Sequence, residues 1–517
     1  MRQLRRLASA VALTATVGLV ATLAASSNSF SLSPLTLLSG PSPFAGCSIG
    51  DFNNAVVYPN AEEEPLVDVN PATASNILAV LQQDRWSNGG ARGLVTAVTH
   101  NGGLSWTETF PHFSLCAGGN PANGGDFTRS SDPWVSFSPN GTAYQISLSV
   151  TLNTGENGVL VSRSTNGGDT WSEPTTLIRD SGGRDASYAF NDKESITADP
   201  TDSRYAYAVW DRFVTPSGTS QAAEEGFFNS RSYRQPVWFA RTTDGGRTWE
   251  PARKIYDRSE FNGTIGNQIA VLPSGTLVDI FDEFFTNKNS DKQRGESIAV
   301  IRSTDKGVTW SKQSTVVAPS REIGAFDPDT GRPIRAEGGI PEIAVDRSSG
   351  ALYAVWQDAS FSGVDEIALA KSTDGGQTWS TPIKVNQTPR NPTAPADQQA
   401  FVPQVHVAAD GTVAVTYYDF RNNGASPGVP TDYWIVHCHA SQTTTCTSPG
   451  DWGNEARLTA TSFDVEQAPA ARGPFGYFLG DYEGLTSIGS TFLPVFVAVN
   501  NGNTGNRTDV FERTAGP

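Results

Sequence analysis

The chain has 517 residues, of which 38% are hydrophobic and only 17% are charged, so it can bury a large core and is not intrinsically disordered. Its 37 Lys and Arg against 53 Asp and Glu give a net charge of −16, which argues against binding to nucleic acid, because a phosphate backbone needs a basic surface. The 50 glycines and 32 prolines are too few for a low-complexity chain, but they suit a fold with many tight turns.

The first 25 residues are typical of a secretory signal peptide. Three arginines within residues 1–6 precede an apolar stretch that ends in small residues near Ala24. An uncleaved membrane anchor is the alternative, because the stretch approaches the length of a membrane span. We therefore expect a secreted protein with a signal peptide over residues 1–25 and a flexible, Ser-, Leu- and Pro-rich leader over residues 26–52. We expect no membrane contact after cleavage.

Four cysteines follow the expected signal peptide, and an even number in an exported chain predicts two disulfide bonds. Cys438 and Cys446 are close in sequence and form the natural local pair, which leaves Cys47 to pair with Cys116. Zinc binding is the alternative for Cys438, because a histidine stands on each side of it. That spacing matches no familiar zinc motif, so the disulfide interpretation is favoured.

An eight-residue pattern recurs along the chain: Ser or Thr, then Asp or Asn two residues later, Gly after two more, Ser or Thr after two more, and Trp last. The five copies are residues 99–106, 164–171, 242–249, 303–310 and 372–379. The Asp or Asn side chain can accept hydrogen bonds from backbone N–H groups of its own turn, and Gly allows the positive φ that a hairpin needs. The Trp ring can pack on the sheet beside it. Each copy is therefore predicted to be a structural hairpin turn and not a catalytic motif.

A second repeated unit precedes each copy and consists of two strands joined by a turn. These units begin near Pro65, Pro133, Ser195, Asn267, Glu342, Val402 and Gly480. Regularly spaced short strands predict a closed all-β architecture. The segment Asn54–Tyr58 could supply a fourth strand to the last unit and so remove the free edges of the sheet. We expect a single β-propeller domain over residues 53–517, with seven four-stranded antiparallel blades favoured and six as the alternative.

The five copies resemble the Asp-box (BNR) repeats of the sialidase superfamily, and the resemblance covers nearly all residues after about Asn53. It implies that each repeat joins the third and fourth strands of a blade, on the face opposite the active site. It also implies a glycoside hydrolase of the exo-sialidase type. Catalytic members of this family have six blades, so the favoured count of seven departs from them.

Charged residues gather where second strands are expected to end, on the face away from the repeats. They are Arg85, Asp211, Arg212, Asp282, Glu283, Asp419 and Arg421. We expect them to bind a polar substrate in a central funnel. Sialidases hold the substrate carboxylate with three arginines, and the three arginines of this set could form such a triad, because planar guanidinium donors suit a carboxylate. Salt bridges within the fold are the alternative for each Asp–Arg pair.

The segment Asp481–Leu485 is similar in place and shape to the family's late Tyr-Ser-x-Leu segment. The resemblance implies Tyr482 as nucleophile, Glu194 as the carboxylate that activates it, and Asp132 as the proton donor; a Tyr nucleophile is a known exception among glycosidases. The alternatives are a core aromatic for Tyr482 and loop-capping carboxylates for the other two. The family's Arg-Ile-Pro signature is absent, and the acidic segment Glu62–Pro65 stands in the first unit, where it would repel an anionic substrate.

Two functions follow from these patterns. The first is a secreted, exo-acting glycoside hydrolase of the sialidase type that acts on a terminal acidic or modified sugar. The second is a non-catalytic propeller that binds glycans or cell-surface proteins, because a scaffold can outlive its chemistry. We expect a monomer whose partner is a glycan, with no nucleic acid and no cofactor; calcium could bind acidic residues of the funnel, but no ligand spacing identifies a site.

Overall fold

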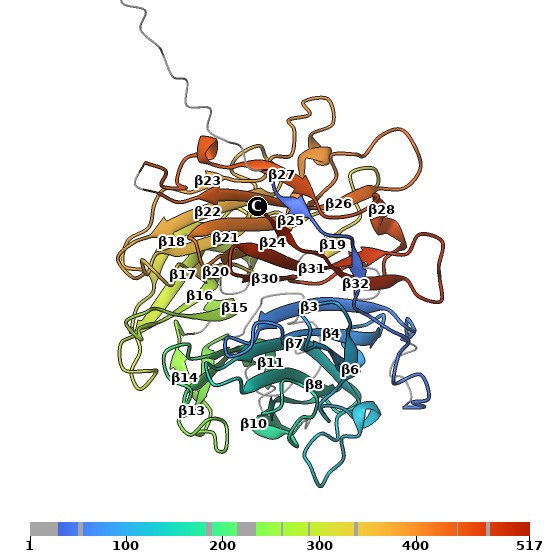
Figure 1. The fold of residues 1–517 in the computed structure, drawn as a ribbon, viewed down its shortest axis with the longest axis vertical. Coiled ribbons are helices and arrows are strands. Elements are labelled where there is room, and N and C mark those ends of the chain that lie inside the picture. Colours follow the sequence, from blue (N-terminus) through green and yellow to red (C-terminus); the bar gives the residue numbers. More distant parts are fainter. Residues whose placement is uncertain are drawn as a thin grey trace, which may run out of the picture.

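The computed structural model describes most of the chain, and its described part is almost entirely β-structure (Figure 1). The described residues are 29–49, 55–181, 189–214, 234–259, 262–287, 290–335, 340–441, 443–471 and 476–517. The expected signal peptide, residues 1–25, lies outside them. Within these ranges, no helix is long and apolar enough to cross a membrane.

Seven four-stranded antiparallel units follow one another along the described residues. The first unit contains β3 (Glu62–Val69), β4 (Ile77–Arg85), β5 (Ala91–Thr99) and β6 (Thr107–Thr109). The second contains β7 (Arg129–Phe137), β8 (Ala143–Thr151), β9 (Glu156–Ser164) and β10 (Thr175–Asp180). The third contains β11 (Ala189–Ala198), β12 (Ala206–Val214), β13 (Val237–Thr242) and β14 (Arg253–Tyr256). The fourth contains β15 (Asn262–Val271), β16 (Leu277–Asn287), β17 (Ser290–Ser303) and β18 (Thr315–Pro319).

The remaining three units have the same plan. The fifth contains β20 (Glu342–Val345), β21 (Leu352–Asp358), β22 (Glu366–Ser372) and β23 (Ile383–Lys384). The sixth contains β24 (Ala400–Val407), β25 (Thr412–Asp419), β26 (Pro430–His439) and β27 (Gly453–Arg457). The last contains β30 (Gly484–Ile488), β31 (Thr491–Val499), β32 (Thr508–Glu512) and β2 (Thr36–Leu37).

Short elements complete the described structure. They are the strands β1 (Ser31–Leu32), β19 (Ile334–Arg335), β28 (Phe463–Asp464), β29 (Tyr477–Phe478) and β33 (Ala515–Gly516), and the 3-10 helices η1 (Leu115–Ala117), η2 (Pro395–Gln398), η3 (Pro449–Asp451) and η4 (Val465–Gln467).

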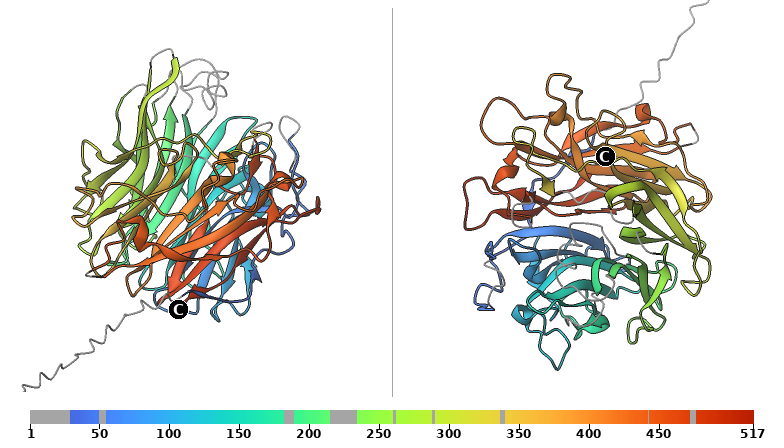
Figure 2. Two further views of the ribbon diagram at one scale, coloured as in Figure 1. Left: turned by 90° about the horizontal axis from the view of Figure 1, so that it is seen from above. Right: turned by 180° about the vertical axis from the view of Figure 1, so that it is seen from behind.

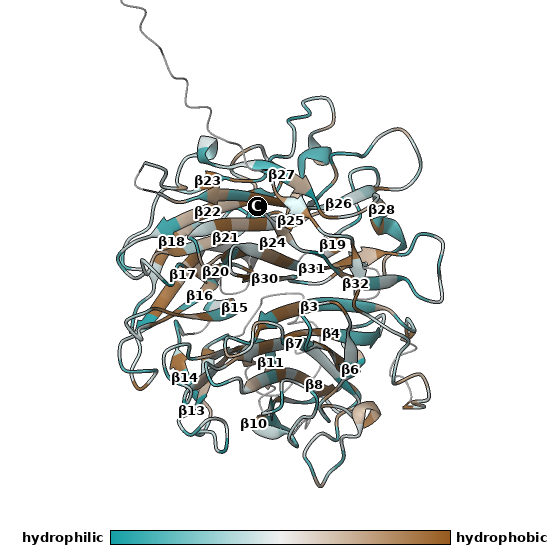
Figure 3. Cartoon of the chain, viewed as in Figure 1, coloured by the Kyte–Doolittle hydropathy of each residue, from teal (hydrophilic) through white to brown (hydrophobic). Residues whose placement is uncertain are grey.

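The first strands of the units contact one another in ring order: β3, β7, β11, β15, β20, β24, β30 and then β3 again. They lie around the middle of Figure 1, and the view from behind in Figure 2 shows the red last unit beside the blue first unit. We interpret this ring as a seven-bladed propeller in which each sheet packs on its two neighbours. Hydrophobic residues concentrate on the strands, and hydrophilic residues on the connecting loops (Figure 3).

The last unit takes its fourth strand from the N-terminal segment. Strand β2 pairs with β32, and β1 pairs with β33, so the described part of the expected leader, residues 29–49, is bonded to the last sheet. The prediction that Asn54–Tyr58 supplies this strand was wrong, because Val57 forms only an isolated bridge with Trp86. The sequence pattern shows that a segment is extended, but it does not show which sheet edge the segment joins.

Both predicted disulfides are confirmed. Cys47 is bonded to Cys116, and Cys438 is bonded to Cys446. The first bond ties the N-terminal segment to the loop that follows β6, and the second closes the turn between β26 and β27. The zinc alternative fails because the Cys438 sulfur is used in the disulfide. The neighbouring His437 stacks on the ring of Phe30 in the N-terminal segment.

The five repeats lie between the third and fourth strands of the first five units, as predicted. In the copy 372–379, the Ser372 hydroxyl donates to the Asp374 carboxylate and accepts from the backbone N–H of Gly376, both at 2.9 Å. Asp374 Oδ1 accepts from the backbone N–H of Thr378 at 2.9 Å, and Oδ2 accepts from its hydroxyl at 2.6 Å. These hydrogen bonds lower the pKa of Asp374 to about 2, although desolvation opposes them. The carboxylate is therefore a fixed part of the turn.

The repeats also join each unit to the one before it. In the second unit, Gly167 accepts a hydrogen bond from the side chain of Asn76, which lies in the first unit, at 2.9 Å. Gly168 has a φ of 98°, and a Cβ there would lie 2.4 Å from the Leu78 side chain. Only glycine suits this position, because any other residue would clash with Leu78 and would be strained at this positive φ. We call the face of the ring that carries these turns the repeat face.

Substitution of Asp374 tests the structural role of the repeats. Asp374→Ala is expected to lower the free energy of unfolding by about 1–2 kcal/mol, because the turn loses its acceptor for the Thr378 groups. Asp374→Asn should cost less, since Asn101 and Asn166 occupy the same position in two natural copies and make equivalent bonds. Denaturant unfolding of both variants measures the difference. Equal losses for Ala and Asn would contradict this role.

Candidate active site

Five of the seven first strands carry the same irregularity. The register shifts within β3, β7, β11, β15 and β24, and one residue at each shift has positive φ. In the adjacent strands β3, β7 and β11 these residues are Glu64, Asp132 and Lys193, with φ of 52°, 53° and 50°, whereas β15 has Gly266 and β24 has Val402. For a residue other than glycine this conformation costs on the order of 1–3 kcal/mol, and such strain is concentrated at functional sites. The three strained residues of β3, β7 and β11 differ from the other two in being charged and in lying in adjacent units.

The three strained residues belong to one buried group, which we call the central polar cluster: Glu64, Asp132, Lys193, Glu194, Asp481 and Tyr482. The Lys193 ammonium lies 2.5 Å from Asp481 Oδ2 and 3.6 Å from Asp132 Oδ2. The backbone N–H of Lys193 also donates to Asp132 Oδ2, at 3.3 Å. One lysine therefore stands among four carboxyl groups, so at least part of the cluster must be protonated to be stable.

Glu194 is the member of this cluster with unused hydrogen-bonding capacity. Its side chain is buried, and neither carboxylate oxygen has a hydrogen-bond partner in another described residue. Burial, reinforced by the charge of Asp132, raises the pKa of Glu194 well above its usual value. Glu194 lines a cavity of about 20 Å³ together with Tyr482, Trp134 and other residues, which is room for one water molecule. A buried acid beside such a space is ready to donate a proton.

Tyr482 lies in the same cluster, but its hydroxyl is already engaged. The hydroxyl donates to the Pro133 carbonyl at 2.9 Å, and its ring centroid lies 5.2 Å from that of Trp134. Burial raises the pKa of Tyr482 well above its usual value, and the neighbouring carboxylates, Glu64 first, raise it further. The phenol is therefore held in its protonated form in this arrangement.

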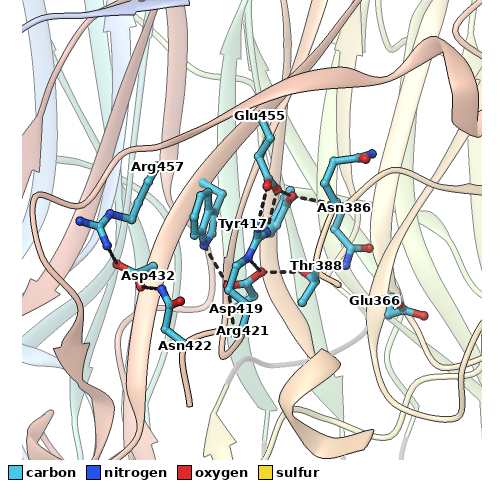
Figure 4. A network of polar contacts seen from close by, with 12 residues as sticks. Glu366, Asn386, Thr388, Tyr417, Asp419, Arg421, Asn422, Asp432, Glu455 and Arg457 are labelled. Atoms are coloured by element: carbon cyan, nitrogen blue, oxygen red, sulfur yellow. Dashed lines mark hydrogen bonds and ion pairs between the residues drawn. The ribbon is translucent and has the colours of Figure 1, made fainter. Parts of the chain in front are cut away.

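The three arginines of the expected triad are each paired with carboxylates of the fold, and among the described residues none contacts another. Arg421 Nε donates to Asp419 at 2.6 Å, and its remaining donors bind Glu455 (Figure 4). Its guanidinium also stacks on Trp434, 3.7 Å from the ring centroid. Asp419 is in turn bonded to Thr388 at 2.7 Å. Both residues are thus part of the framework of the sixth unit.

Arg85 and Arg212 have similar surroundings. Arg85 Nε lies 2.8 Å from Glu63 Oε2, and its guanidinium stacks on Phe478 at 3.6 Å. Arg212 makes a bidentate contact with Asp180 and stacks on a tryptophan of β13. Both arginines form salt bridges within the fold, but with Glu63 and Asp180 and not with the aspartate that precedes each of them in the sequence. Of the Asp–Arg pairs, Asp419–Arg421 forms the salt bridge stated as the alternative.

The Asp211 carboxylate joins the third unit to the fourth. Its oxygens accept hydrogen bonds from the backbone N–H of Gly266 at 2.9 Å, the hydroxyl of Thr264 at 2.8 Å and the amide of Asn267 at 2.6 Å. All three donors lie in β15. Asp211 therefore fixes the irregular start of the neighbouring first strand.

Asp282 and Glu283 lie in the middle of β16, which continues to Asn287 and so does not end at them as expected. Glu283 accepts from the Tyr256 hydroxyl at 2.5 Å and from Arg258 Nε at 2.9 Å. Burial raises the pKa of Asp282 well above its usual value, and the adjacent Glu296 raises it further. These bonds and charges lie within the third and fourth units.

The sequence interpretation did not select three members of the central polar cluster: Glu64, Lys193 and Asp481. A signal for the first two exists in the alignment of the units, because Glu64-Pro65, Asp132-Pro133 and Lys193-Glu194 occupy the same place at the start of successive first strands. Among the described residues, no group of three His, Cys, Asp or Glu side chains is arranged to hold a metal ion.

Comparisons with known proteins agree with the resemblance carried by the repeats. No protein-family model matches the chain. A segment of 135 residues is 33% identical to a sialidase of Bacteroides fragilis (strain YCH46), and the match spans 23% of this chain and only 23% of that protein. This sequence likeness and the four-stranded antiparallel sheets fit the sialidase superfamily and its β-propeller fold.

Two solved structures align with most of the chain at low sequence identity and with TM-scores below 0.5. The Hadza microbial sialidase Hz136 is 16% identical, with a TM-score of 0.45, over 86% of this chain and 74% of that one. The NanB sialidase of Streptococcus pneumoniae is 10% identical, with a TM-score of 0.44, over 94% of this chain and 98% of that one.

The stability of the protein should depend on the protonation of its buried carboxyl groups. Burial raises the pKa of Glu342, which lines the same small cavity as Glu194, from 4.5 to about 8. The folded state then keeps a proton that the unfolded state loses, so stability should fall as the pH rises from about 5 to 8. Glu342→Gln mimics the protonated form and should be more stable than the wild type at pH 9, on the order of a few kcal/mol, but not at pH 5.

Thermal unfolding across this pH range measures the effect of Glu342→Gln. Asp202→Asn is the control, because hydrogen bonds from Arg204 lower the pKa of Asp202 to about 2 and its contribution is constant above pH 5. If the melting temperature of Glu342→Gln changes with pH in the same way as that of the wild type, the prediction is wrong.

Proposed function

We propose that this chain is a secreted glycoside hydrolase that acts at the end of a glycan, with the central polar cluster as its reaction centre. The observation that carries the proposal is Glu194, a buried carboxyl group with no hydrogen-bond partner in another described residue, close to Asp132 and the Lys193 ammonium. Pairs of carboxyl groups kept in different protonation states are the machinery of most glycosidases. The likeness to sialidases and the two disulfides support hydrolysis and export.

The two carboxyl groups suit different roles. Glu194 has a raised pKa, so it is the general acid that protonates the leaving oxygen of the glycosidic bond. Asp132 accepts a backbone N–H and lies 3.6 Å from the ammonium of Lys193. A carboxylate in this position can stabilise the positive charge that develops on the sugar ring, or attack it. Both groups lie within first strands, Asp132 in β7 and Glu194 in β11, and the pairing of these strands holds their backbones in place.

Tyr482 is assigned a supporting role in this proposal. A phenolate at this place would form among carboxylates and would have to leave the Pro133 carbonyl, both of which oppose its formation. Its ring packs on Trp134 and forms part of the wall beside Glu194. The proposed chemistry therefore rests on carboxyl groups, and it differs from the Tyr-nucleophile mechanism that the resemblance implies.

The charge of the cluster supports a neutral terminal sugar over an acidic one. Four carboxyl groups face one ammonium, and the three arginines that would attract an anion are bound to carboxylates already. An anionic sugar would bring a further negative charge into this field. A neutral sugar offers hydroxyl groups that can donate to the carboxylates.

A non-catalytic glycan-binding propeller is the second candidate. The Tyr482 hydroxyl donates to a backbone carbonyl, which favours this candidate. A fold can be retained while a residue that reacts in related enzymes serves only to stabilise it. The two candidates differ in turnover, which a substrate panel measures.

Turnover of fluorogenic glycosides tests the proposal. The purified chain should hydrolyse a neutral terminal glycoside faster than a sialoside, and Glu194→Gln should lower kcat at least about 100-fold because the general acid is lost. Tyr482→Phe should lose less than about tenfold if the phenol does not react. Glu173→Gln, an exposed site on the repeat side, is the control that should change nothing. No turnover on any glycoside, together with binding on a glycan array, would establish the second candidate instead.

The pH profile gives an independent test of Glu194. Because the reaction needs its protonated form, kcat/KM should decrease as the pH rises above the raised pKa of Glu194, which lies well above 4.5. The same limb should be missing from the residual activity of Glu194→Gln. An alkaline limb that persists unchanged in this variant would assign the acid to another group.

A further inference from the structure

A large cavity lies in the central channel, on the opposite side of the ring from the proposed reaction centre. Its volume is about 800 Å³, and residues from all seven first strands line it. The lining includes the turns that follow β3, β20 and β24, at Pro71, Ser348 and Ala409, so the cavity is at the repeat face. A cavity of this size is in the range of small-ligand sites.

Arg347 stands in this cavity with most of its donors unused. Its only hydrogen bond among the described residues is from Nη1 to the Val271 carbonyl, at 3.0 Å, and it makes no ion pair there. The side chain is exposed, yet desolvation lowers its pKa. The two observations agree if its exposed surface faces the confined space of the channel. A guanidinium with free planar donors is suited to bind a ligand in that space.

Two further polar groups line the same cavity from other units. Asp68 in β3 accepts the backbone N–H groups of Val69 and Phe137, at 2.8 and 2.7 Å, and each oxygen keeps a free lone pair. His406 in β24 is bonded to the Ser487 hydroxyl at 3.0 Å, and desolvation lowers its pKa to about 4, so the imidazole is neutral. The cavity thus presents a strong donor and a strong acceptor on opposite sides.

The charges of the cavity decide the class of ligand. Arg347 is balanced by Asp68, and Asp346 at the rim adds a second carboxylate. Glu342 at the inner end is buried, and its raised pKa of about 8 keeps it uncharged at neutral pH. A small anion would gain the guanidinium but would face two carboxylates. A neutral molecule with adjacent hydroxyl groups can accept from Arg347 and donate to Asp68 at once.

We propose that the central channel at the repeat face is a second site that binds a neutral mono- or disaccharide through Arg347, Asp68 and His406. Trp134, Gln268 and Glu342 line both this channel and the small cavity beside Glu194, so they form the partition between the two sites. The proposal does not rest on glycoside hydrolysis, since binding at the repeat face needs no reaction at the other face.

Isothermal titration calorimetry of the full chain tests this site. The probes are neutral monosaccharides and disaccharides, with N-acetylneuraminic acid and glucuronic acid as acidic probes. At least one neutral sugar should bind, and Arg347→Gln and Asp68→Asn should each weaken its affinity about tenfold or more, because each removes a hydrogen bond to a charged group. Arg204→Gln is the matched control, because Arg204 is an exposed arginine on the same face, bonded to Asp202 outside the channel.

Three outcomes would overturn the proposal: no neutral sugar binds, an acidic sugar binds more tightly than every neutral one, or both channel variants bind like the wild type. Thermal unfolding shows whether each variant is folded. If Arg347→Gln fails to fold, Arg347→Lys, which keeps the charge but loses the planar donors, replaces it and should also weaken binding.

Discussion

Each sheet of this molecule has both faces covered by its neighbours in the ring, and the rest of the structure depends on that mutual coverage. A four-stranded sheet alone would expose apolar side chains on two sides, which costs free energy in water. The repeats provide the fit between sheets, as Gly168 packing against Leu78 illustrates. The ring is complete only because β2 joins the last sheet while β30 contacts β3. Because the ring is closed, each first strand is held between its two neighbours, and the central polar cluster lies on three of these strands and on the segment before β30.

The central polar cluster lowers the stability of the folded state. Carboxyl groups removed from water and placed close together oppose folding unless protons or cations compensate them. Here Lys193 provides one positive charge, and three residues adopt strained backbone angles to bring the groups together. The strained backbone angle belongs to the ring in general, because β24 has the same register shift and a positive φ at Val402. The charged side chains do not follow from it, since Val402 is apolar, and buried charge that the fold does not require is a common sign of a functional site.

The sequence predicted those features that depend on local patterns. The repeats predicted the hairpin turns and the run of similar units, and the cysteine spacing predicted both disulfides. The pairing of Thr36–Leu37 was not predictable, because a two-residue strand carries no periodicity. The expected arginine triad rested on position at strand ends, whereas the partner of each arginine depends on side-chain packing. Arg347 was missed for the opposite reason: it lies in a turn on the face where only structure was expected.

The N-terminal strand has a consequence for how the molecule is made. The Ser39 hydroxyl is bonded to the Asp509 carboxylate, 470 residues further along the chain. A segment synthesised early therefore waits until the last unit has emerged before its partner exists. Contacts over such sequence distances slow folding, and until they form the outer edge of β32 is an open strand that other chains can join. The ring can therefore close only after the residues around Asp509 have been synthesised, and β32 is most exposed to pairing with other chains in the interval before β2 joins it.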